Sequence, residues 1–108
     1  MSQNNPSQNR GRDVDRIIEG VRRIFPEVIV EQLKVTYPAD DDGLWYFHLL
    51  ENPKDDIQIE SSYGSCPFLI ENMRKGDRKI GESVEQVVSI ICEYFREGRE
   101  GASFQREA

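Results

Sequence analysis

Residues 44–50 read LWYFHLL, and this short run decides the fold. Turn-forming clusters flank it on both sides, PADDDG at 38–43 and ENPKDD at 51–56. The shortness of the run, its flanking turns and its aromatic content favour a strand over a buried helix. Because it is apolar on both sides, it also predicts a sheet whose two faces both carry apolar residues at this strand.

Three further strands are predicted around this run, at 28–37 (VIVEQLKVTY), 57–60 (IQIE) and 68–73 (FLIENM). The links between consecutive strands are short, which predicts an antiparallel meander. The segment RKGDRKIG at 74–81 returns to polar residues, with glycines as breakers, and is predicted to be a loop.

Helical periodicity brackets the strands. Asp13 is a candidate N-cap for an apolar stripe that ends before Pro26, and its members are Val14, Ile17, Ile18, Val21 and Ile24. Ser83 and Gln86 form a capping box for a second helix, for which Gly98 is the predicted C-cap. The second stripe comprises Val84, Val87, Val88, Ile91 and Phe95.

The predicted order is therefore α-β-β-β-β-α. Two amphipathic helices must bury their stripes, and one face of a four-stranded sheet can receive both. We expect an α+β two-layer sandwich with both helices on one face. A single domain is predicted at 13–98, between tails at 1–12 and 99–108 that are too polar to pack and are expected to be disordered.

Strand alternation divides the apolar residues between the two faces. The set expected to face the helices is Trp45, Phe47, Leu49, Ile57, Ile59, Phe68 and Ile70. The set expected on the opposite face is Leu44, Tyr46, His48, Leu50, Val28, Val30, Leu69 and Met73, mixed with Gln32, Lys34, Gln58 and Glu60. Apolar groups rimmed by polar ones are typical of an interface, although a loop or tail folded over them would give the same pattern.

The chain has 20 acidic and 14 basic side chains, a formal net charge of −6. A negative field disfavours nucleic acid and anionic membrane surfaces and favours a basic protein partner, although the same charge serves solubility alone. There is no secretory signal, and two cysteines make no disulfide framework, so we expect a cytoplasmic protein.

Two acidic turns lie beside the aromatic strand, with carboxylates at Asp40, Asp41, Asp42, Asp55 and Asp56. Together with Leu44, Tyr46 and His48 they form the predicted protein-binding surface. Leu44 occupies the next alternate position after the first acidic turn, which excludes a calcium loop there, and one histidine with two distant cysteines does not support zinc. No metal and no cofactor is predicted.

Cys66 and the single histidine, His48, could form a nucleophilic pair, in which the imidazole lowers the pKa of the thiol. Their spacing does not specify contact and no third orienting residue stands out, so a structural role is favoured for both and no catalytic residue is assigned. The cations of the 74–81 loop could hold an acidic ligand or could simply be solvated.

Three stretches resemble small bacterial α+β proteins, some of which look like immunity proteins of toxin systems: GLWYF (43–47), ESSYGSCPFLIE (60–71) and GESVEQVVSIICEYF (81–95). This resemblance implies a cytosolic protein that neutralises a toxin by binding it, and it carries no site residue. Three hypotheses stand in order of preference: a binding protein for a basic partner, a self-associating domain that dimerises through the same face, and a Cys66-dependent enzyme.

Overall fold

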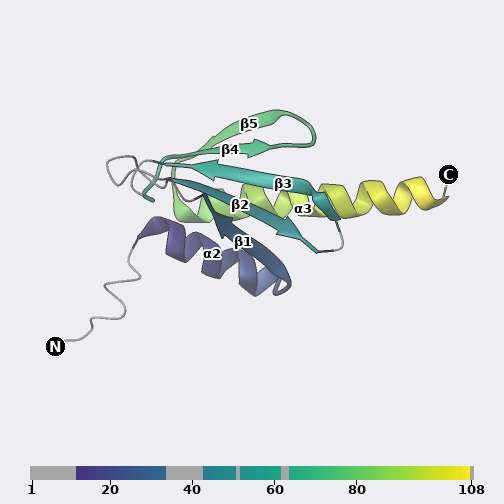
Figure 1. Ribbon diagram of the computed structural model, residues 1–108, viewed down its shortest axis with the longest axis horizontal. Coiled ribbons are helices and arrows are strands. Elements are labelled where there is room, and N and C mark those ends of the chain that lie inside the picture. Colours follow the sequence, from purple (N-terminus) through teal and green to yellow (C-terminus); the bar gives the residue numbers. More distant parts are fainter. Residues whose placement is uncertain (1–11, 34–42, 51, 62–63, 108) are drawn as a thin grey trace.

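A computed structural model describes residues 12–33, 43–50, 52–61 and 64–107, with the side chains in these ranges apart from those of 52–55 and 100–107. Two helices flank five strands in the chain (Figure 1). The helices are α2 (Asp13–Ile24) and α3 (Val84–Glu107); the strands are β1 (Val28–Gln32), β2 (Leu44–Leu49), β3 (Asn52–Glu60), β4 (Phe68–Asn72) and β5 (Asp77–Gly81). Within these ranges, no helix combines the length and apolar character needed to cross a membrane.

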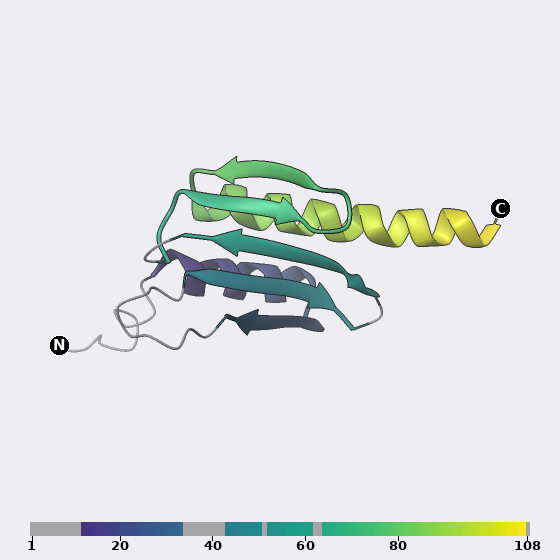
Figure 2. The ribbon, with the colours of Figure 1, turned by 45° about the horizontal axis from the view of Figure 1, so that its top comes forward.

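The strands form one antiparallel sheet in the order β1-β2-β3-β4-β5. Figure 2 shows both helices behind this sheet, on the same face. The α+β two-layer arrangement with an antiparallel meander is therefore confirmed. The predicted number of strands is wrong, because the segment at 74–81 forms a tight turn followed by β5.

β5 escaped prediction because it is an edge strand with little apolar content. Four of its five residues are exposed and only Gly81 is buried. Its backbone pairs with β4 throughout, from Asn72 opposite Asp77 to Phe68 opposite Gly81. The link is a tight turn in which Gly76 has a φ of 78°, a conformation that glycine adopts readily. Backbone pairing and turn chemistry, rather than side-chain burial, form this strand.

The core lies between the sheet and the helices, and all seven residues expected to face the helices are buried. The set is Trp45, Phe47, Leu49, Ile57, Ile59, Phe68 and Ile70, covered by Val14, Ile17 and Val21 of α2 and by Val87, Ile91, Tyr94 and Phe95 of α3. The helix axes approach closely at Gly20, where an added Cβ would lie 2.8 Å from a methyl group of Val88. This close approach lets both helices share one sheet face.

The side assignment predicted for the first strand is wrong. Val28 pairs with Leu49 and Val30 with Phe47, both of which point into the core. Val28 is buried and Val30 packs against the core, so the outward residues of β1 are Ile29 and Glu31. A strand with apolar residues at three consecutive positions does not reveal from sequence which two face inward.

Helix α2 begins differently from the prediction. Arg12 is the N-cap and makes no side-chain cap hydrogen bond, whereas Asp13 is the first helical residue. The Asp13 carboxylate instead accepts a hydrogen bond of 2.8 Å from the backbone N–H of Cys66. The helix ends at Ile24, just before Phe25 and Pro26, as predicted. Asp13 thus connects α2 to the loop before β4.

Helix α3 begins as predicted, because Ser83 Oγ accepts a hydrogen bond from the N–H of Gln86. The predicted end at Gly98 is wrong, since the helix continues to Glu107 through the segment predicted to be a disordered tail. Gly98 is buried, and Arg99 pairs with Glu27 and lies 4.9 Å from the centre of the Phe25 ring. These contacts support the helix beyond Gly98, since a glycine inside a helix lowers its stability by about 1 kcal/mol relative to alanine. The domain limit at 98 stays a prediction, and the tail at 1–12 lies outside the described residues except for Arg12.

Candidate functional site

The face of the sheet opposite the helices is covered by no described element, and we call it the open face (Figure 2). Residues directly opposite each other on antiparallel strands share a face, so the strand pairing places its side chains in rows. One row consists of Leu44, Glu60, Leu69 and Ile80, one from each of β2 to β5. Ile80 is 51% exposed, and Leu33, which donates its N–H to the carbonyl oxygen of Leu44, is 42% exposed. This apolar row therefore presents accessible hydrocarbon on both sides of the carboxylate of Glu60.

The next row is polar. It runs through Glu31, Tyr46, Gln58, Glu71 and Arg78, one residue from each strand. Arg78 Nε lies 3.6 Å from Glu71 Oε2, an exposed cross-strand ion pair. The phenol ring of Tyr46 is half-buried between Glu31 and Gln58. The row offers hydrogen-bonding groups in the middle of the open face.

His48 marks the other end of the open face. His48 lies opposite Ile29 of β1, and its Nδ1 lies 3.5 Å from Asp56 Oδ1. That carboxylate oxygen is buried and makes no hydrogen bond among the described residues. The sheet is irregular here, because the pairing between β2 and β3 shifts between Phe47 and Leu49. The only histidine of the chain is thus held beside a carboxylate rather than beside a thiol.

Four of the eight residues predicted for the binding surface can be placed together. Leu44, Tyr46 and His48 lie on the open face as expected, and Asp56 contacts His48. The side chain of Asp55 and the whole of Asp40, Asp41 and Asp42 lie outside the described residues. The sequence prediction missed Ile29, Glu31, Arg78 and Ile80, since it reversed the sides of β1 and took β5 for a loop.

The surroundings of Cys66 disfavour a role as a nucleophile. Burial, together with the nearby Asp13 carboxylate, raises the pKa of the Cys66 thiol to about 11, so the thiol is protonated at neutral pH. The loop that holds Cys66 begins at the Leu44 end of β2, where the N–H of Ser61 bonds to the carbonyl oxygen of Gly43. His48 lies about 13 Å further along β2, at ~3.3 Å per residue. The strand therefore carries the imidazole away from the thiol.

The cations of the 74–81 segment are largely paired with acidic or aromatic groups. Lys75 Nζ lies 3.1 Å from Glu97 Oε1 of α3, and Lys79 Nζ lies 5.2 Å from the centre of the Tyr94 ring. Arg78 pairs with Glu71 on the open face. These contacts fasten β5 to α3 and β4, so Lys75, Arg78 and Lys79 are already engaged within the chain and are not simply solvated.

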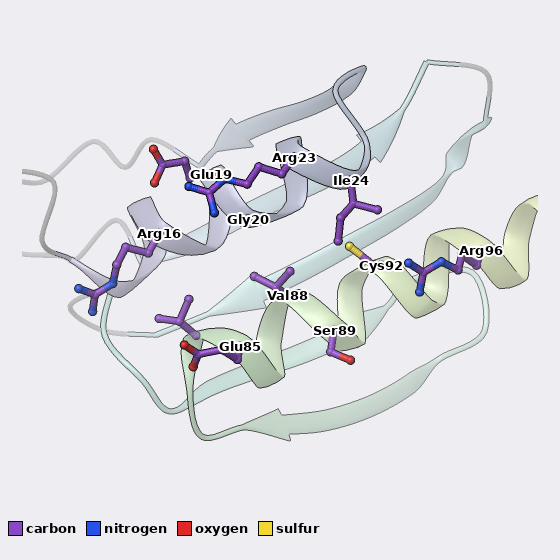
Figure 3. A pocket seen from close by; sticks show the side chains of 11 residues that line it. Arg16, Glu19, Gly20, Arg23, Ile24, Glu85, Val88, Ser89, Cys92 and Arg96 are labelled. Carbon is purple, nitrogen blue, oxygen red and sulfur yellow. The ribbon is translucent and has the colours of Figure 1, made fainter.

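A groove of about 510 Å³ runs between α2 and α3 on the side away from the sheet (Figure 3). Its floor is apolar, with Gly20, Val88 and Cys92. Its rim mixes both signs of charge, and the charged side chains are Arg16, Glu19, Arg23, Glu85 and Arg96. Arg16 is further engaged by Asp13, at 2.6 Å. Because the rim has little net charge, it selects no partner by electrostatics.

Among the residues that the structure describes, no three histidine, cysteine, aspartate or glutamate side chains are grouped so that they could hold a metal ion. Comparison with protein families, with curated proteins and with solved structures gives no match. The function has to be argued from the surface itself, and the open face is its most distinctive part.

Proposed function

We propose that this chain is a small protein-binding domain whose open face takes a basic protein partner. The observation that carries the proposal is the combination, on one uncovered sheet face, of exposed apolar side chains with carboxylates that lack a described cation. Apolar groups surrounded by polar ones are the usual anatomy of a protein interface. The sharpest form of the proposal is an inhibitor of the immunity type, which neutralises a basic toxin domain by covering it.

The charged groups of the open face indicate the net charge expected of the partner. The described carboxylates of the open face are those of Glu31, Asp56, Glu60 and Glu71, and its described cation is Arg78, which is engaged by Glu71. Glu31 and Glu60 are both exposed and form no ion pair with any described residue. Complementary charge accelerates the encounter of two proteins and suppresses partners of like charge.

The charge of the open face also disfavours the alternative, self-association through this face. A two-fold dimer that buries the open face would bring the same surface of two copies together. Because the described carboxylates of this face outnumber its described cation, the two faces would carry like net charge, which opposes association. A basic partner satisfies both the apolar row and the carboxylates, so it is preferred over a second copy.

The test is capture of partners from the lysate of the native cell by the tagged chain, with two matched charge-reversal variants. Glu31→Lys with Glu60→Lys alters the open face, and Glu19→Lys with Glu93→Lys alters exposed positions on the helices. Each pair changes the net charge equally, by two reversals of +2, from −6 to −2. The captured protein is identified by mass spectrometry, purified, and its association rate is measured against salt concentration.

We expect the wild type and the helix variant to capture one basic protein in stoichiometric amount. The open-face variant should associate about tenfold more slowly and with a flatter salt dependence. Equal capture by both variants would refute the proposal, as would a partner whose association ignores salt. If the captured protein is an enzyme, inhibition of its activity by this chain tests the immunity form directly.

A further inference from the structure

One end of the open face is hollowed. The hollow has a volume of about 510 Å³ and lies where β3, β4 and β5 meet the loop that precedes β4. Leu69 and Ile80 line it from the apolar row, Pro67 lines it from the loop, and Glu60 contributes a carboxylate. It therefore combines a hydrocarbon surface with one negative charge.

The position of Glu60 is unusual for a glutamate. Its cross-strand neighbours are Leu44 on one side and Leu69 on the other, with Ile80 beyond. One row away, Glu71 also stands on β4, but there the opposite residue of β5 is Arg78, which pairs with it at 3.6 Å. A carboxylate in an apolar row gains nothing from the cross-strand pairing that stabilises sheets. The charge of Glu60 thus serves no described contact within the chain.

Several described polar groups of the loop beside the hollow are engaged in hydrogen bonds. Ser61 Oγ hydrogen-bonds the carbonyl oxygen of Ser65 and accepts the N–H of Ser65 at 3.3 Å. Asp13 holds the N–H of Cys66 from the side of α2. Glu60 is the charged residue of the described lining, and its carboxylate forms no ion pair with a described residue.

We infer that this hollow receives an arginine side chain of the basic partner, an inference that rests on the proposed function. The hydrocarbon stem of arginine packs on apolar surface while its charged end stays polar, which matches Leu69 and Ile80 beside Glu60. The planar guanidinium can donate two parallel hydrogen bonds to one carboxylate. Arginine is also among the residues that most often dominate binding energy when they are seated in a pocket.

The test uses the full chain and a small probe, so that no partner is needed. Butylguanidinium is titrated into the protein and the backbone amide NMR signals of Ser61, Leu69 and Ile80 are followed. We expect these signals to shift together with one saturating curve, and Glu60→Gln to weaken the affinity about fivefold. Glu31→Gln is the matched control, because it removes the same charge from an exposed position of the same face on β1, two strands away.

Three results would overturn the inference. One is an unchanged affinity for butylguanidinium in Glu60→Gln, in a variant whose own amide spectrum shows an intact fold. Another is an equal set of amide shifts with butanol, which would mean that the hollow binds hydrocarbon regardless of charge. A stronger response to butylammonium than to butylguanidinium would overturn the choice of arginine in favour of lysine. If protein capture depends on the open face while the probe ignores Glu60, this inference falls and the proposed function stands.

Discussion

Replacing Gly81 by alanine is expected to destabilise the fold through one contact between β5 and α3. Gly81 ends β5 and is buried, although the other four residues of that strand are exposed. An added Cβ would overlap Cγ2 of Val87, in the first turns of α3, and would lie 3.1 Å from Cδ1 of Ile70. The sheet can keep its pairing to Phe68 only if the strand, the helix or the Val87 side chain moves.

The magnitude follows from the packing. Adding a methyl group to a filled core costs about 1–3 kcal/mol, so we expect the Gly81→Ala variant to lose about 2 kcal/mol of unfolding free energy. Val87→Ala removes two buried carbons and should cost about 2 kcal/mol by itself. The double variant should cost only about 2 kcal/mol rather than the sum of about 4 kcal/mol, because Val87→Ala removes the overlapped methyl group.

Urea unfolding followed by the fluorescence of Trp45 measures these costs, since Trp45 is the single tryptophan and is buried in the core. The midpoint of thermal unfolding should fall by roughly 10 °C in Gly81→Ala. Strictly additive costs in the double variant would refute the reasoning, as would a cost below about 0.5 kcal/mol for Gly81→Ala. Either result would mean that β5 does not pack against the start of α3.

Three further predictions concern polar groups. The N–H of Cys66 and, secondarily, Arg16 lower the pKa of Asp13, so its contribution to stability is present above pH ~4 and is lost as the pH falls through the lowered value. Asp13→Asn should flatten the profile of urea stability against pH in that window. With a pKa of about 11, Cys66 should react slowly with iodoacetamide at pH 8, where about one thiol in a thousand is ionised. The rate of alkylation is measured against pH in a Cys92→Ala background, and a rate profile with its midpoint near pH 8.5 would contradict this. Tyr94 buries a hydroxyl that has no hydrogen-bond partner among the described residues, so Tyr94→Phe should leave stability unchanged or raise it by about 1 kcal/mol, and a loss above 1 kcal/mol in urea unfolding would argue against it.

The inner half of the fold could be predicted because its buried residues recur at every second position of the strands. In Trp45, Phe47 and Leu49, and again in Ile57 and Ile59, every second residue is apolar and buried. A shift of one residue would expose the whole set, so the pattern admits one register relative to the core. The stripes of both helices carry the same information at helical spacing.

The edges could not be predicted for the opposite reason. β5 buries only Gly81, so its four exposed residues leave no alternation to detect. Val28, Ile29 and Val30 are all apolar, and the choice between the two sides of β1 was made by its pairing with β2. The end of α3 depends on Arg99 meeting Glu27 and Phe25, residues far away in the sequence. Long-range contacts decide such boundaries, and local propensity does not contain them.

The candidate site divides in the same way. Leu44, Tyr46 and His48 were found because they alternate with buried residues on one strand. The neighbours that give the open face its character, Glu31 and Ile80, come from the two edge strands and needed the tertiary pairing. The hollow beside Glu60 depends on three strands and a loop, and local sequence therefore gave no signal for it.

The apolar surroundings of two carboxylates favour recognition over mere solubility. Away from the open face, some acidic groups stand beside basic ones, as in Asp13 with Arg16 and Glu97 with Lys75, and others, such as Glu19, stand on the solvent-exposed side of a helix. On the open face, Glu31 and Glu60 stand beside Tyr46, Leu44 and Leu69 instead. Solubility requires charge but does not require that carboxylates without a described cation stand among apolar side chains on the sheet face that the helices leave uncovered. A basic partner does require it, because its cations need acceptors that none of the described residues has already engaged.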